Sequence, residues 1–339
     1  MSTPSAQTDS FVRDRLPPRE QWPEFRYDLP ELQIPDQANV ATTLLGDAIA
    51  KGWGNRLMLR SPGETYTYAE ANAQVNRIAE MLVKDYKLEP GNRVLLRGGN
   101  SIGMALAWLG VVKAGLIAVA TMPLLRAVEL DKIIDKSRPA LAICDVDLLK
   151  EMVPAAQDAK ALLPILVFGD AARPDGMEAR AARRSADWAG CATAADDVAL
   201  LAFTSGTTGV PKAVITTHRD VLAACNAWPR SVLKATPDDV VTGSPPLAFT
   251  FGLGGLLLFP MAAGASVYYP DVRFSPETMV RKMRDNGITI CYTAPTFYRQ
   301  MAPYAKALGI PSLRTCVSAG EALPDATRQL WKESTGIEM

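Results

Sequence analysis

The densest group of residues able to do chemistry runs from Thr204 to Lys212, with the sequence Thr-Ser-Gly-Thr-Thr-Gly-Val-Pro-Lys. Glycine lets backbone N–H groups turn toward an anion, and hydroxyl groups add hydrogen-bond donors without bulk. Lys212 adds a mobile positive charge that suits phosphate oxygens. We therefore predict a phosphate-binding loop made of Thr204, Ser205, Gly206, Thr207, Thr208, Gly209 and Lys212.

This loop is not a Walker motif. Glycine does not precede Lys212, and Ala213 stands where that motif has a metal-binding Ser or Thr. The residues after Lys212 have strand character, so no helix N-terminus is needed to hold the phosphate. The alternative interpretation is a polar hairpin turn between two strands.

The elements around the loop predict an α/β protein. From about residue 41 onward, short β-branched runs alternate with helical patterns, which is typical of parallel sheets covered by helices. We predict an N-terminal extension (1–40), a first α/β lobe (41–190) and a second α/β lobe (191–339) that carries the phosphate loop. The expected strands are Leu57–Arg60, Thr65–Thr67, Arg93–Arg97, Leu116–Ala120, Ala140–Cys144, Val198–Phe203, Ala213–Thr216, Val240–Thr242, Ala265–Tyr269, Thr289–Tyr292 and Arg314–Ser318.

One apolar segment, Leu247–Tyr269, is long enough to cross a bilayer and contains no charged residue. However, it contains several glycines and Pro260, and it has no Lys or Arg anchors at its edges. We expect Pro260 and Gly264 to divide it into a buried helix and the strand Ala265–Tyr269. The sequence therefore predicts no membrane partner.

Composition narrows the function classes further. Lys plus Arg total 36 and Asp plus Glu total 36, and this balance argues against a nucleic-acid partner. The five cysteines form no CxxC pair, so we predict neither a disulfide framework nor a metal site. Cys144, Cys291 and Cys316 lie in apolar runs typical of buried thiols. The polar N-terminus has no signal-peptide core, and a cytoplasmic location is expected.

Three motifs together resemble the adenylate-forming superfamily of acyl-CoA synthetases, luciferases and peptide-synthetase adenylation domains. Thr204–Lys212 matches its signature phosphate loop, although Ala213 stands where the family usually has glycine. Val317–Pro324 is similar to the adenine-binding segment, and Pro246–Leu253 is similar to the segment that lines the acyl pocket. The resemblance covers Thr42 to Met339 and implies the large N-terminal domain of such an enzyme.

The resemblance also implies roles for individual residues. Adenine would bind at Ser318, Ala319, Gly320, Glu321 and Ala322, and the substrate pocket would include Phe249, Thr250, Phe251 and Gly252. Many members have histidine where this chain has Phe249, and phenylalanine there is similar to benzoate-type CoA ligases. The run Phe11–Pro18 with Trp22-Pro23 looks most like 2-aminobenzoate–CoA ligases. Phe249 and Phe251 also suit plain core packing, and the two interpretations are compatible because aryl pockets are apolar.

The implied reaction has two steps and uses ATP, Mg²⁺ and CoA. A carboxylate attacks the α-phosphorus of ATP, which gives an acyl-adenylate and releases pyrophosphate, and the CoA thiol then displaces AMP. An aromatic acid is already ionised at pH 7, so the first step needs no general base. His218, the single histidine, follows Thr217 at an expected helix start, and we predict a capping or orienting role for it. We assign no catalytic residue with certainty.

Other outcomes stay open at this point. The same domain could load a carrier protein instead of CoA, act on acyl chains in general, or bind nucleotides without catalysis. Gly336–Met339 reads as the start of another strand, so we expect the natural chain to continue. The family's Mg²⁺-binding Glu segment and C-terminal domain have no counterpart in these residues, and we expect the chain alone to be inactive.

Overall fold

The computed structural model describes residues 4–159, 162–204, 211–271 and 275–339. These residues form two compact units, each containing one sheet, and each is described by itself. The first unit comprises residues 1–47, 70–99 and 103–227, and the second comprises residues 48–69, 100–102 and 228–339.

The first unit is built on a six-stranded sheet of order β6-β5-β3-β4-β7-β8, in which only the β7–β8 pair is antiparallel. The strands are β3 (Arg93–Arg97), β4 (Ile117–Thr121), β5 (Leu141–Asp145), β6 (Ile165–Phe168), β7 (Val198–Thr204) and β8 (Lys212–Thr217). The helices that lie wholly or mostly in this unit are α1 (Val40–Ala50), α2 (Tyr68–Lys84), α3 (Ile102–Lys113), α4 (Ala127–Ser137), α5 (Leu149–Asp158), α6 (Met177–Ala181) and α7 (His218–Trp228).

One face of this sheet packs against α4 and α5. Alternate strand residues point to the same side of a sheet, and on this side they are apolar. Leu95, Val119 and Cys144 lie on that face and are fully buried together with Leu130 of α4 and Met152 of α5. The predicted α/β architecture with mostly parallel strands is therefore confirmed. The strand β6 is an addition that the sequence analysis did not predict.

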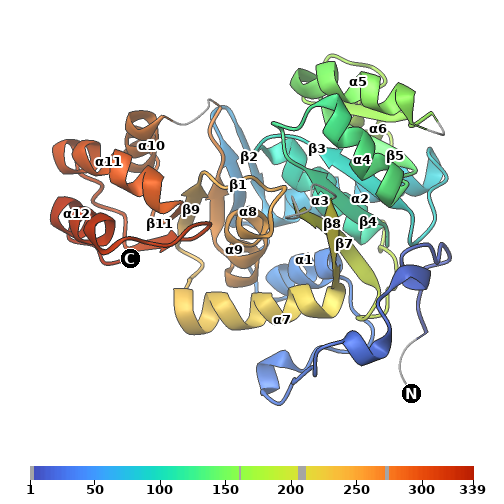
Figure 1. The fold of residues 1–339 in the computed structure, drawn as a ribbon, viewed down its shortest axis with the longest axis horizontal. Coiled ribbons are helices and arrows are strands. Elements are labelled where there is room, and N and C mark those ends of the chain that lie inside the picture. The colour runs from blue at the N-terminus through green and yellow to red at the C-terminus, as the bar shows by residue number, and fades with distance from the viewer. Residues whose placement is uncertain (1–3, 160–161, 205–210, 272–274) are drawn as a thin grey trace. The chain divides into compact units, whose positions relative to one another are not determined.

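The second unit contains a six-stranded sheet of order β12-β11-β9-β10-β1-β2, with β1–β2 as its antiparallel pair. The strands are β1 (Leu57–Ser61), β2 (Glu64–Thr67), β9 (Val240–Gly243), β10 (Ser266–Tyr268), β11 (Ile290–Thr293) and β12 (Thr315–Ser318). Its helices are α8 (Thr250–Leu253), α9 (Phe259–Ala263), α10 (Pro276–Asp285), α11 (Pro295–Leu308) and α12 (Asp325–Thr335). Figure 1 shows α10, α11 and α12 gathered beside β9 and β11.

These three helices cover the sheet face that carries Cys291 and Cys316. Both thiols are buried against Met283 of α10, Tyr298 of α11 and Trp331 of α12. The rings of Tyr298 and Trp331 meet edge to face, with 4.8 Å between their centroids. The prediction of buried thiols in Cys144, Cys291 and Cys316 is confirmed.

The two units differ from the lobes predicted at 41–190 and 191–339. Residues 191–227 belong to the first unit, because β7 pairs with β4 and β8 pairs with β7. The hairpin β1–β2 belongs to the second unit, because β1 pairs in parallel with β10. The β4–β7 and β1–β10 pairings join segments far apart in the sequence, so local sequence patterns cannot predict them.

The apolar segment 247–269 is helical and then extended, as predicted, but Pro260 does not end the helix. Pro260 lies in the first turn of α9, directly after the π-helical residues Gly254–Leu258, where its missing N–H is tolerated. The carbonyl of Leu256, four residues earlier, accepts a hydrogen bond of 2.5 Å from the Tyr269 hydroxyl. Gly264 ends α9 with a φ of 73°. No helix in the described residues is long and apolar enough to span a membrane.

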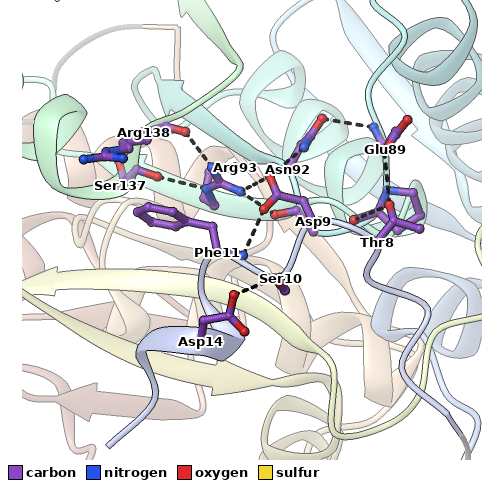
Figure 2. A network of polar contacts seen from close by, with 12 residues as sticks. Thr8, Asp9, Ser10, Phe11, Asp14, Glu89, Asn92, Arg93, Ser137 and Arg138 are labelled. Atoms are coloured by element: carbon purple, nitrogen blue, oxygen red, sulfur yellow. Dashed lines mark hydrogen bonds and ion pairs between the residues drawn. The ribbon is translucent and has the colours of Figure 1, made fainter. Parts of the chain in front are cut away.

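The N-terminal segment is fixed to the first unit by a polar network around Asp9 (Figure 2). Its carboxylate accepts hydrogen bonds from Arg93 at 2.5 Å, from Asn92 at 2.8 Å and from the Phe11 N–H at 2.9 Å. The Arg93 side chain is only 6% exposed and also donates to the carbonyls of Ser137 and Arg138. Burial alone raises the pKa of Asp9, but the hydrogen bonds and the Arg93 charge outweigh it and hold the pKa below its usual value.

Asp9→Asn should therefore lower the free energy of unfolding by about 1–3 kcal/mol at pH 7, because a buried guanidinium loses its counter-charge. Since the Asp9 pKa is lowered on folding, its contribution is complete above the unfolded value of 3.8 and disappears as the pH falls through the folded value. Urea unfolding measures both effects. Asp14→Asn, in the same segment but exposed, is the control and should change stability by less than about 0.5 kcal/mol. Equal effects of the two variants would contradict this account.

Candidate functional site

The candidate site lies at the carboxyl edge of the second unit's sheet, where β9, β11 and β12 end side by side. These strands run parallel, and their register pairs Tyr292 with Gly243 and Thr293 with Ser318. In open α/β sheets, ligands bind outside the carboxyl ends of the strands. The register therefore brings together three segments that follow these strands: 244–252, 294–296 and 319–322.

An aromatic wall lies beside this edge. The Phe251 ring packs at 59° to the Tyr292 ring, with 5.8 Å between centroids, and the Trp228 indole N–H donates to the Tyr292 hydroxyl at 3.4 Å. Tyr292 is 1% exposed, and burial raises the pKa of its hydroxyl to about 12, so it stays protonated at neutral pH. A Cβ atom on Gly255 would lie 2.5 Å from the Tyr292 ring, so only glycine fits there.

The four predicted pocket residues occupy different environments. Phe249 precedes the first residue of α8 and is 44% exposed, whereas Gly252 is buried against the Pro246 backbone. Thr250 is exposed, and Phe251 is the residue that contacts the aromatic wall. Tyr292 was not predicted, since an aromatic residue in an apolar strand looks like an ordinary core residue, and Trp228 at the end of α7 carries no local signal of a site.

Hydroxyl groups line the same edge. The hydroxyls of Ser244 and Thr293 hydrogen bond to each other across β9 and β11. The Ser318 hydroxyl, next in register on β12, is buried without a hydrogen-bond partner among the described residues. Asn100 fixes the segment after Ser244, because its side chain donates to the Pro245 carbonyl at 2.9 Å and accepts from the Leu247 N–H at 2.8 Å.

The predicted adenine segment, Ser318 to Ala322, leaves the sheet at the end of β12. Gly320 has a φ of 93°, a conformation that favours glycine. The Glu321 carboxylate accepts hydrogen bonds from the Thr296 N–H at 2.9 Å and from the Thr296 hydroxyl at 2.6 Å. These bonds lower the pKa of Glu321, so the side chain is a carboxylate at neutral pH.

The two ends of the predicted phosphate loop, Thr204 and Lys212, lie in the first unit. Thr204 ends β7 and pairs with Lys212 at the start of β8, so the two ends of the loop are adjacent. The predicted loop residues Ser205, Gly206, Thr207, Thr208 and Gly209 lie outside the described residues. The antiparallel strands agree with the strand character expected after Lys212. This arrangement is compatible with both a phosphate-binding loop and a simple hairpin turn.

His218 is a structural residue at the start of α7. Its side chain is fully buried, and its Nδ1 atom accepts a hydrogen bond of 3.1 Å from the N–H of Val40, the first residue of α1. Asn39 accepts from the next two N–H groups of α1. Burial lowers the pKa of His218 to about 3, so its imidazole is neutral at pH 7. The predicted capping role is confirmed, although the helix it caps is α1.

Comparison with known proteins identifies the family. The family model described as AMP-binding enzyme matches residues 47–339. The chain belongs to this family.

Two curated relatives of this AMP-binding chain act on aromatic acids by name. The benzoate–CoA ligase of Thauera aromatica is 30% identical over 312 residues, which cover 91% of this chain and 59% of the relative. The anthranilate–CoA ligase of Pseudomonas aeruginosa is 27% identical over 282 residues, which cover 82% and 52%. The chain thus spans a little over half the length of these relatives.

A solved structure agrees with this family fold. The anthranilate CoA ligase AuaEII, in complex with anthranoyl-AMP, superposes with a TM-score of 0.84 and is 27% identical. The match covers 91% of this chain and 59% of that protein.

The protonation state of His218 can be measured directly, because the chain contains one histidine. The measurement tests whether this imidazole stays neutral and buried. Its single imidazole Hε1 NMR signal should stay at one chemical shift from pH 8 down to about 4.5, because burial holds its pKa far below the usual value. Stability should rise with pH between the folded value of about 3 and the unfolded value of 6.5. A titration midpoint near 6.5 in the folded protein would contradict the buried, neutral assignment.

Proposed function

We propose that this chain forms the nucleotide- and substrate-binding part of an enzyme that activates an aromatic carboxylic acid with ATP. The carboxylate displaces pyrophosphate from ATP and becomes an aroyl-adenylate, and the CoA thiol, the proposed acceptor, then displaces AMP. Benzoate and 2-aminobenzoate are the proposed substrates. The observation that carries this proposal is the aromatic wall of Phe251 and Tyr292 at the same sheet edge as the segment 318–322.

The residues suit a reaction that needs positioning rather than proton removal. An aromatic carboxylate is ionised at neutral pH and attacks the α-phosphorus of ATP directly. The transition state then depends on alignment and on charge neutralisation at the phosphates. A buried His218 with its pKa lowered to about 3 agrees with this chemistry, since no histidine base is needed.

The proposal assigns each end of the substrates to a different group of residues. The benzoyl ring would lie against Phe251, and the adenine would lie on the segment 318–322. The ATP phosphates would contact Thr204, Lys212 and the residues between them. Mg²⁺ would neutralise phosphate charge when bound, but the described residues contain no group of three His, Cys, Asp or Glu side chains that could hold a metal. We therefore assign no Mg²⁺ ligand here.

A cytoplasmic location belongs to the same proposal. The five cysteines are free thiols, and four of them are buried. Free thiols suit a reducing compartment.

Stable mimics of the acyl-adenylate test the proposal on the chain itself. Benzoyl- and 2-aminobenzoyl-sulfamoyl adenosine should raise the melting temperature and bind at least about tenfold more tightly than the octanoyl mimic, because the half-buried Phe251 ring, packed on Tyr292, favours a flat aryl group. Isothermal titration calorimetry measures the affinities. Phe251→Ala should remove most of this preference, whereas the matched control Phe25→Ala, an exposed ring of the N-terminal segment, should keep it. Tighter binding of the octanoyl mimic would replace the aryl assignment with a general acyl one.

A further inference from the structure

The N-terminus of α11 lacks a capping side chain of its own. Its N-cap residue is Ala294, which makes no side-chain hydrogen bond, and Pro295 follows at the first helical position. The first N–H groups of a helix have no partner within the helix and need an acceptor from elsewhere. Here Glu321, 25 residues further along the chain, accepts from both the N–H and the hydroxyl of Thr296.

The charge on Glu321 suits this position. A carboxylate at a helix N-terminus is favoured by the helix dipole, and a charge-assisted hydrogen bond is stronger than a neutral one. The hydrogen bonds from Thr296 lower the pKa of Glu321, and the Arg299 charge on the same helix adds to the effect. The carboxylate is therefore directed to α11 and stays ionised.

A second contact joins α11 to the chain just before this segment. The Tyr298 hydroxyl donates to the Cys291 carbonyl at 2.7 Å and lies 3.3 Å from the Val317 carbonyl. Tyr298 itself is fully buried in the core under the sheet. One rigid helix therefore holds the chain on both sides of residues 318–320.

The backbone between these two contacts is available for a ligand. Residues 319–322 make no backbone hydrogen bond within the described part of the chain. Exposed N–H and C=O groups can recognise the edge of a purine, provided that their positions are fixed. The positive φ of Gly320 sets the turn that presents them.

We infer that Glu321 is a positioning residue, which acts through Thr296 and α11 to hold the backbone of residues 319–322 against the purine. This inference rests on the proposed function and changes the role expected for one residue. The sequence analysis placed Glu321 among the adenine-binding residues, whereas the structure directs its side chain to Thr296.

Binding of AMP and GMP to the chain, measured by isothermal titration calorimetry, tests the inference. The wild type should prefer AMP, because adenine and guanine carry opposite donors and acceptors at their edges. Glu321→Ala should weaken AMP binding by about tenfold and change GMP binding by less than about twofold, since a displaced backbone loses discrimination. Glu321→Gln, which keeps an oxygen acceptor, should retain most of the preference.

Thr296 supplies the second half of the experiment. Thr296→Val keeps the N–H donor and loses the hydroxyl, so its effect should be smaller, about threefold. Adding it to Glu321→Ala should cause no further loss, because the two residues act through one contact. Thr296→Ser should behave like the wild type. Glu333→Ala, an exposed glutamate of α12, is the matched control and should change nothing.

The outcomes separate the inference from the proposed function. Hydrogen exchange at the Thr296 amide should accelerate in Glu321→Ala, and the melting temperature should fall by only a few degrees, as expected for the loss of one helix-capping contact. Independent, additive effects of the two substitutions, or an unchanged AMP affinity in both, would overturn the positioning role and leave the proposed function standing. Failure of the wild type to bind AMP would overturn both.

Discussion

The parallel register of β9, β11 and β12 is the constraint on which the candidate site depends. It sets Gly243 beside Tyr292 and Thr293 beside Ser318, so that three loops leave the sheet at one level. Side chains alternate between the two faces of a sheet. A shift of one residue in β11 would therefore move Tyr292 to the face that Cys291 now occupies under the helices. The aromatic wall, the hydroxyl row and the segment 318–322 are all consequences of this register.

Packing on the sheet face opposite Tyr292 fixes the register of these strands. Cys291 and Cys316 are buried under α10, α11 and α12, and Trp331 is fully buried against Tyr298. A charged or larger residue at either cysteine would disturb close-packed neighbours. The site and the core thus share the same three strands, with ligand chemistry at their carboxyl ends and apolar packing along their length.

Local sequence patterns predicted much of this structure. Apolar runs bounded by turn residues predicted the strands on either side of the proposed phosphate loop and the two strands within 57–67. The apolar residues and glycines after Pro246 predicted the helical segment there. The division into units did not follow, because it depends on the pairing of β7 with β4 and of β1 with β10. Tyr292 was missed because nothing in an apolar strand tells a core ring from a ring at a site. The link from Glu321 to Thr296 joins the segment after β12 to the first turn of α11, and no local pattern predicts such a contact.

The central claim is that an aroyl-adenylate binds at the carboxyl edge of the second sheet. A crystal structure of the chain with 2-aminobenzoyl-sulfamoyl adenosine tests it most directly. The account predicts the aryl ring within about 4 Å of the Phe251 ring. It also predicts the purine edge on the backbone of residues 319–322, with Glu321 still bonded to Thr296. An aryl ring bound away from Phe251 and Tyr292, or a purine held by the Glu321 carboxylate, would contradict it.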